Sequence, residues 1–371
     1  MIRISVKSTL FRKTSLLALC LICFGGIYEK IIQDRAEKVL VLDPNISLSR
    51  DELVRAFTFI EKHSRDKKKK FLPQESRVPC TIERSSLLNG YILSNFKNDF
   101  VGFGAHKHIK KVVLYGNQPK VLAECHADRS GQAETKILKL LQGKPGIVPY
   151  YGTFAKSKKR FTIYLEYFPE GSILDKLKQG YSFSEQEILH IAHDLVNGLR
   201  SIHDLKLVHR DLHFGNCLLR RNADGMFEAV FVDFGKTQPF NRLNGVFPQV
   251  PKSKNPPEIL TTPLYLINRY QADIYALGCL FFHLVWGKST PWGYLYNYKL
   301  MSTFSVEKKK RLYAKIVSFY ALTKKEKINH LLKKDERTSF DKFKIIIFNM
   351  LHYQPNQRPT LDSIDTFLQG F

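Results

Sequence analysis

The chain has 371 residues, of which 44% are hydrophobic, with ordinary numbers of glycine and proline. This composition is that of a globular protein with one large core, and it excludes a disordered or fibrous chain. Lysine and arginine outnumber the acidic residues 58 to 34, and the formal charge of +24 favours phosphate, acidic substrates or anionic membranes as neighbours. The basic segment 308–344 carries apolar residues at helical spacing, so we interpret it as a solvated helical face and expect no nucleic-acid partner.

Residues 1–30 form a hydrophobic leader. The first 28 residues contain no acid, carry four basic residues and are apolar from Leu16 to Ile27. This pattern is typical of a secretory signal or a short anchor, although a transmembrane helix needs about 20 apolar residues. We expect membrane association or export through residues 14–28, with the cytoplasm as the alternative location.

Residues 31–94 form an N-terminal extension. Its clearest element begins at Ser49, which forms a capping box with Glu52 ahead of apolar residues at helical spacing. The sequence therefore predicts one amphipathic helix in the extension, followed by a linker around the lysine run and Pro73.

From residue 95 the pattern is first β-rich and then helical. Short β-rich runs are predicted at Phe100 to Phe103, Ile109 to Leu114, Lys120 to Cys125 and Thr162 to Tyr167. One helix is predicted around 132–141, and helical periodicity dominates after Gly171, as in 188–202 and 274–285. These patterns indicate an α+β protein with a small β-rich lobe at 95–169 and a larger helical lobe at 170–371.

Two motifs in the second lobe carry the chemistry. Residues 209–216 have the sequence HRDLHFGN, and residues 233–235, seventeen positions after Asn216, are DFG behind an apolar run. They resemble the catalytic loop and the metal-binding motif of the protein kinase family. Phosphoryl transfer from ATP needs a carboxylate to orient the attacking hydroxyl and oxygen ligands for Mg²⁺. The resemblance implies that Asp211 is the catalytic base, that Arg210 is a further catalytic residue, and that Asn216 and Asp233 bind magnesium.

The first lobe resembles the family's phosphate-binding loop, with departures. Gly102 and Gly104 match its first two glycines, but Lys107 stands where the third is usual, and Cys125 occupies the position of the phosphate-binding lysine. The with-no-lysine kinases have the same pair of changes. This likeness implies that Lys107 contacts the ATP phosphates and pairs with Glu134 of the predicted helix.

Further matches concern the hinge and the architecture of the second lobe. Glu166 resembles a hinge residue beside adenine, and Glu258 lies in a sequence similar to the end of the family's activation segment. Asp273 resembles the buried acid that holds the catalytic-loop backbone. Arg358 resembles the family's late arginine, whose expected partner is Glu258.

The acceptor class is less clearly marked. Serine/threonine kinases usually carry lysine two residues after the catalytic aspartate, where this chain has His213, and Pro251 stands where they have threonine. We expect the more common class, an ATP- and magnesium-dependent protein kinase acting on serine or threonine of a protein substrate. The alternatives are a pseudokinase scaffold and a small-molecule or glycan kinase of a secretory compartment.

Overall fold

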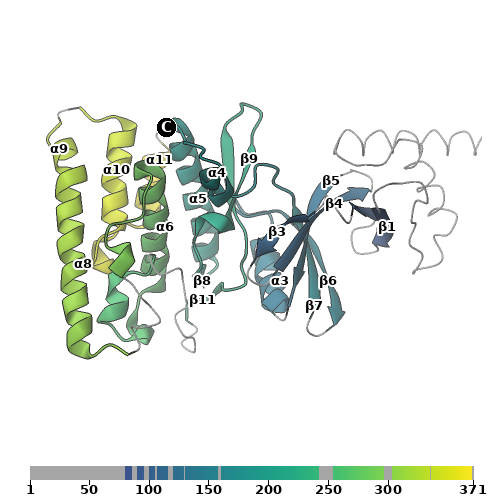
Figure 1. Ribbon diagram of the computed structural model, residues 1–371, viewed down its shortest axis with the longest axis horizontal. Coiled ribbons are helices and arrows are strands. Elements are labelled where there is room, and N and C mark those ends of the chain that lie inside the picture. Colours follow the sequence, from purple (N-terminus) through teal and green to yellow (C-terminus); the bar gives the residue numbers. More distant parts are fainter. Residues whose placement is uncertain are drawn as a thin grey trace, which may run out of the picture. The chain divides into compact units, whose positions relative to one another are not determined.

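A computed structural model describes residues 80–85, 90–95, 100–104, 107–115, 120–128, 130–157, 160–241, 254–295, 303–334 and 336–369. The leader and the helix predicted after Ser49 lie outside these residues. The chain divides into two compact units, one containing the residues up to 129 and 151–167 and the other containing 130–150 and 168–371 (Figure 1).

The first unit is built on a seven-stranded sheet with the order β1-β2-β4-β5-β7-β6, in which β3 pairs with β4. Its strands are β1 (Cys80–Ser85), β2 (Gly90–Asn95), β3 (Phe100–Gly104), β4 (Lys107–Tyr115), β5 (Lys120–Ala127), β6 (Tyr150–Ser157) and β7 (Arg160–Glu166). The central strands β4, β5 and β7 pair antiparallel. They are the β-rich runs that the sequence predicted.

The sheet also contains strands that the sequence did not predict. β1 and β2 precede residue 95, where the sequence analysis begins the domain, and β2 pairs with β4 from Tyr91 opposite Tyr115 to Leu93 opposite Val113. Ile92 is buried with Val112, Leu114, Leu122 and Tyr164 in one hydrophobic cluster. The sheet therefore extends into the segment assigned to the extension, because the place of β1 and β2 follows from strand pairing and not from their own sequence pattern.

The second unit is mainly helical. Its helices are α3 (Ser130–Leu141), α4 (Ile173–Lys178), α5 (Glu185–Asp204), α6 (Arg269–Trp286), α8 (Val306–Lys327), α9 (Asn329–Leu332), α10 (Ser339–Met350) and α11 (Leu361–Leu368). Two small antiparallel strand pairs accompany them, β8 (Leu207–Val208) with β11 (Gln238–Pro239) and the hairpin of β9 (Cys217–Arg221) with β10 (Phe227–Phe231). The predicted α+β organisation is confirmed.

Helix α6 forms the centre of the helical unit and packs against α5 and α10 (Figure 1). Most of its side chains are buried, and it ends at Gly287, whose φ of 68° is left-handed. Glycine adopts that conformation without strain, so it ends the helix there. Helix α5 begins at a capping box of Ser184 and Glu187.

A close backbone approach ties α5 to the segment after α3. Gly198 on α5 faces Gly146, which has a φ of 65°, and a Cβ at Gly198 would lie 2.7 Å from the Gly146 carbonyl oxygen. That same oxygen accepts a hydrogen bond from the Phe231 backbone at 2.8 Å. The glycine pair thus lets β10 and α5 meet the 145–148 segment.

Helix α8 buries few of its side chains, namely Ile316, Tyr320 and Thr323. Its lysines therefore cover a largely solvated helical face, as the sequence indicated. Among the residues that the structure describes, no helix is long and apolar enough to cross a membrane.

Candidate active site

The backbone of the HRD segment is held by a carboxylate of helix α6. Asp273 is buried, and it accepts hydrogen bonds from the backbone nitrogens of His209 at 2.7 Å and Arg210 at 3.0 Å. His203 Nε2 lies 3.1 Å from the same carboxylate. Arg210 has a φ of 69°, a costly conformation for a residue with a Cβ, and the two bonds to Asp273 hold it there. The predicted role of Asp273 in holding this loop is confirmed.

Asp211 is buried beside two basic side chains. Its Oδ2 lies 2.9 Å from Lys236 Nζ and 3.8 Å from His213 Nε2. Its Oδ1 is also buried and accepts no hydrogen bond from the described residues. One carboxylate oxygen is thus oriented by a cation, while the other can accept a hydrogen bond from a hydroxyl group.

The buried ring of His209 contacts the backbone of the catalytic loop. Burial lowers its pKa, although the nearby carboxylates of Asp273 and Asp211 act in the opposite direction. The Asp211 backbone nitrogen donates to His209 Nδ1 at 3.3 Å, so the neutral imidazole carries its proton on Nε2. The ring packs edge-on against Phe231 at a centroid distance of 5.2 Å.

Asn216 directly precedes β9 and Asp233 comes two residues after β10, at the end of the hairpin where Cys217 lies opposite Phe231. The Val232 backbone nitrogen donates to the Asn216 carbonyl oxygen at 3.0 Å, so the two chain segments stay together beyond the hairpin. Asn216 Nδ2 donates to the Asp211 carbonyl oxygen at 3.0 Å, which leaves its Oδ1 as a possible metal ligand.

Asp233 has a φ of 64°, and its Oδ1 accepts a hydrogen bond from the Gly235 backbone at 3.3 Å. The neighbouring Phe234 is completely buried, with its ring 5.6 Å from that of His209. This packing fixes the DFG backbone in a conformation that costs about 1–3 kcal/mol for a non-glycine residue. Strained backbone of this kind concentrates at functional sites.

Lys236 is a candidate that the sequence analysis missed. It directly follows the DFG motif, its carbonyl oxygen lies 3.5 Å from Arg210 Nη1, and its Nζ reaches Asp211. The signal in the sequence was the replacement of the lysine usual after the catalytic aspartate by His213. With His213 at that position, the lysine beside Asp211 comes from the neighbouring loop after the DFG motif.

The candidate residues of the first unit lie on the strands β3, β4, β5 and β7 of its sheet. Gly104 pairs with Lys107 and Gly102 with Ile109 across β3 and β4, and Ile109 pairs with the buried Cys125 of β5. The Lys107 side chain lies outside the described residues. Glu166 ends β7, where its backbone pairs with Leu122.

Glu134 is buried. It lies on α3, which belongs to the second unit. The pairing of Lys107 with Glu134 stays a prediction, because the Lys107 side chain is not described.

The end of the activation segment is joined to the C-terminal part of the chain. Arg358 donates from Nη1 and Nη2 to the two carboxylate oxygens of Glu258 at 2.8 and 2.7 Å, and both side chains are buried. Arg358 also donates to the backbone oxygens of Gln271 at 2.9 Å and His352 at 2.8 Å. The predicted pair of Glu258 and Arg358 is confirmed.

A comparison with protein-family models gives one match that includes this site. The model for the protein kinase domain matches residues 103–367. The chain belongs to the protein kinase family. Residues 103–367 span both units and all the motifs described above, apart from Gly102 at the edge of the match.

Several curated kinases are similar to this chain. Mitogen-activated protein kinase kinase kinase 5 of Arabidopsis thaliana is 30% identical over 220 residues, which cover 57% of this chain and 28% of that protein. Calcium-dependent protein kinase 27 of the same plant is 31% identical over 184 residues, 47% of this chain and 36% of its own length. Serine/threonine-protein kinase YPK3 of Saccharomyces cerevisiae is 28% identical over 225 residues, 57% of this chain and 40% of its own length. The match therefore spans less than half the length of each relative.

Proposed function

We propose that this chain is an active ATP-dependent protein kinase that phosphorylates serine or threonine in a protein substrate. The observation that carries the proposal is the state of Asp211, a buried carboxylate on a fixed backbone whose Oδ1 accepts no hydrogen bond from the described residues. Similarity to the serine/threonine kinase from Saccharomyces cerevisiae supports the acceptor class. The alternatives, a scaffold without activity and a kinase for small molecules, have no such observation in their favour.

In the proposed mechanism, Asp211 Oδ1 accepts a hydrogen bond from the substrate hydroxyl and orients its oxygen for in-line attack on the γ-phosphorus of ATP. The Oγ–P bond forms as the bond to the ADP oxygen breaks, and the hydroxyl proton passes to the carboxylate. Lys236 beside Oδ2 holds the carboxylate in place and adds positive charge near the transferring group.

The residues present fit magnesium. Asn216 supplies an amide oxygen and Asp233 a carboxylate, and hard divalent cations prefer such oxygen ligands. When bound, Mg²⁺ neutralises charge on the phosphates of ATP. The bond from Val232 to Asn216 keeps the two proposed ligands at the same end of the hairpin.

Backbone register supports Lys107 as the phosphate-binding cation. Lys107 lies two positions before Ile109 on β4, and Ile109 pairs with Cys125. Positions two apart along a strand share a face of the sheet, so position 107 is on the same face as Cys125. We propose that a cation at 107 acts from the strand next to the position that carries it in most of the family, with Glu134 as its partner and with Gly102 and Gly104 on β3 before it.

We also propose that residues 14–28 associate with a membrane. The apolar composition of the segment supports this, and it lies outside the described residues. Fractionation of cells that express the full chain or the chain without residues 14–28 tests the proposal. Recovery of both proteins in the same fraction would contradict it.

Radiolabelled phosphate transfer from Mg-ATP to generic protein substrates tests the main proposal. We expect Asp211→Asn to lower the rate by about 10²–10⁴-fold, the usual contribution of a positioned acid or base. Lys107→Met is expected to abolish transfer, and Asp233→Asn to abolish the thermal stabilisation by Mg-ATP. Asp224→Asn, at an exposed turn between β9 and β10, is the matched control and should behave as the wild type.

Two outcomes would overturn the proposal. A wild-type protein that Mg-ATP does not stabilise would indicate a pseudokinase scaffold. Stabilisation by Mg-ATP with transfer to sugars or other small molecules, and not to proteins, would indicate the small-molecule alternative.

A further inference from the structure

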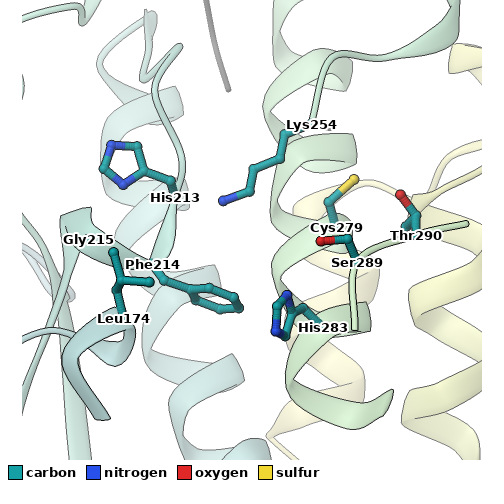
Figure 2. Close-up of a pocket in the computed structure, with 9 residues that line it drawn as sticks. All are labelled: Leu174, His213, Phe214, Gly215, Lys254, Cys279, His283, Ser289 and Thr290. Carbon is teal, nitrogen blue, oxygen red and sulfur yellow. The ribbon is translucent and has the colours of Figure 1, made fainter. Parts of the chain in front are cut away.

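A second feature of the helical unit is a pocket beside the catalytic loop. It has a volume of about 320 Å³ and is lined by residues of α4, the catalytic loop, α6 and the segment after α6. Figure 2 shows His213 and Phe214 on one side and Cys279 and His283 of α6 on the other. All of these residues belong to the second unit.

The side chain of Lys254 extends into this pocket (Figure 2). Its ammonium group lies 5.2 Å from the centroid of the Phe214 ring, and it makes no hydrogen bond or ion pair with any residue that the structure describes. Burial lowers its pKa to about 8, although Cys217, Cys279 and Asp211 act in the opposite direction. A partly desolvated cation without a hydrogen-bonding partner is unfavourable, and an anion that enters the pocket would relieve that cost.

The rest of the lining also suits an anion. His213 and His283 each offer an imidazole, and none of the described lining residues is acidic. Each imidazole can donate an N–H to an anion in the pocket.

The pocket lies next to the proposed base. His213 lines it and has its Nε2 3.8 Å from Asp211 Oδ2. A peptide whose hydroxyl reaches Asp211 must therefore place a nearby side chain at or close to the pocket mouth. The dimensions fit a side chain with a carboxylate or a phosphate, since small-ligand sites begin at about 300 Å³.

We propose that this pocket binds an anionic side chain of the protein substrate, either a carboxylate or a phosphorylated hydroxyl, close to the residue that is phosphorylated. Lys254 supplies the charge, and His213 and His283 supply hydrogen bonds. The proposal rests on the kinase activity proposed above. It makes Lys254 a determinant of substrate specificity that does not take part in phosphoryl transfer.

Peptide libraries with a central serine test the specificity. Each flanking position in turn carries glutamate, phosphoserine, glutamine or lysine, and kcat/KM is measured with the full chain. At one or more positions we expect the acidic peptide to exceed its glutamine match by about tenfold, equivalent to about 1.4 kcal/mol. In Lys254→Met this ratio should fall to about one, and in Lys254→Glu the lysine peptide should be preferred. Lys325→Met, on an exposed position of α8, is the matched control and should keep the wild-type ratio.

Direct binding separates this proposal from the kinase proposal. Isothermal titration with a phosphoserine peptide and a glutamate peptide, without nucleotide, should give binding to the wild type and at least about tenfold weaker binding to Lys254→Met. A protein that binds these peptides through Lys254 but transfers no phosphate would leave the pocket assignment intact and overturn the kinase proposal. Equal kcat/KM for acidic and neutral peptides, with no Lys254-dependent binding, would overturn the pocket assignment alone. The stronger of the two peptides shows whether phosphate or carboxylate is the preferred group.

Discussion

Lys236 lies 2.9 Å from Asp211 Oδ2, and 46% of its side chain is exposed. The Lys236 ammonium is largely solvated although Asp211 is buried, so we expect Lys236→Met to lower the free energy of unfolding by no more than about 1 kcal/mol. The same substitution removes positive charge beside the reacting group. We therefore expect kcat to fall by about 10–100-fold, with a smaller change in the KM for ATP.

Steady-state kinetics and urea denaturation measure both effects. Lys236→Arg should recover most of the activity because it keeps the charge. Lys178→Met, on an exposed position of α4, is the control. A wild-type kcat in Lys236→Met would show that the ion pair with Asp211 has no catalytic role.

Lys254 gives a prediction for the dependence of stability on pH. Burial lowers its pKa from 10.5 to about 8, so between these two values the folded state holds fewer protons at this residue than the unfolded state. The contribution of this residue to the free energy of unfolding therefore rises with pH across that window. Below about pH 8 the folded state carries the full cost of the buried charge.

The measurement is the difference in unfolding free energy between the wild type and Lys254→Met as a function of pH. This difference should rise in favour of the wild type from about pH 8 to 10.5. The neighbouring thiols of Cys217 and Cys279 titrate in both proteins, each with its pKa raised by burial to about 12, and largely cancel in the difference. Among the residues that the structure describes, the other titratable groups near the ammonium are Asp211, His213 and His283. A flat difference would contradict the burial of the charged amine.

Helix α6 determines the geometry of the catalytic loop. Asp273 accepts hydrogen bonds from two backbone N–H groups of that loop, and one of these groups belongs to His209, which is fully buried. Asp273→Asn replaces an acceptor by an amide that can turn only one oxygen toward two donors. Since an unsatisfied buried donor costs about 1–3 kcal/mol, we expect a loss of at least about 1 kcal/mol in stability.

The rate of phosphate transfer should fall by more than unfolding of the variant explains, because Arg210 would no longer be held in its left-handed conformation. Thermal unfolding and the transfer assay at a temperature where the variant is folded separate the two effects. His190→Ala, at an exposed position of α5, is the control for a substitution on a neighbouring helix. Full activity of folded Asp273→Asn would show that the loop keeps its conformation without this carboxylate.

The burial of Ile92 in the sheet core indicates that the first unit begins before residue 95. Ile92 is 8% exposed and packs with Val112, Leu114 and Leu122. Ile92→Ala should therefore destabilise the full chain by about 2–5 kcal/mol, as truncations of buried isoleucine usually do. Phe154→Ala, on β6 with 53% exposure, is the control for an exposed position. A loss below about 0.5 kcal/mol in Ile92→Ala would support a domain that begins at residue 95.

The sequence alone determined the α+β class, the family and the residues of the two central motifs. Each of the two motifs, HRDLHFGN and DFG, is an unbroken run of residues. The chemistry of phosphoryl transfer restricts which residue types can occupy these positions. The buried acid Asp273 and the pair of Glu258 and Arg358 were also predictable, because their order along the chain matches the family. The central strands β4, β5 and β7 and the helices α5 and α6 were predictable from periodicity.

The tertiary structure decided what depends on contacts between distant segments. β1 and β2 carry little periodicity of their own, and their place follows from pairing with β4. Lys236 and Lys254 look like ordinary surface lysines in the sequence. Only the fold brings Lys236 to Asp211 and buries Lys254 among Phe214 and α6, because the charge environment of a side chain depends on neighbours that are remote along the chain.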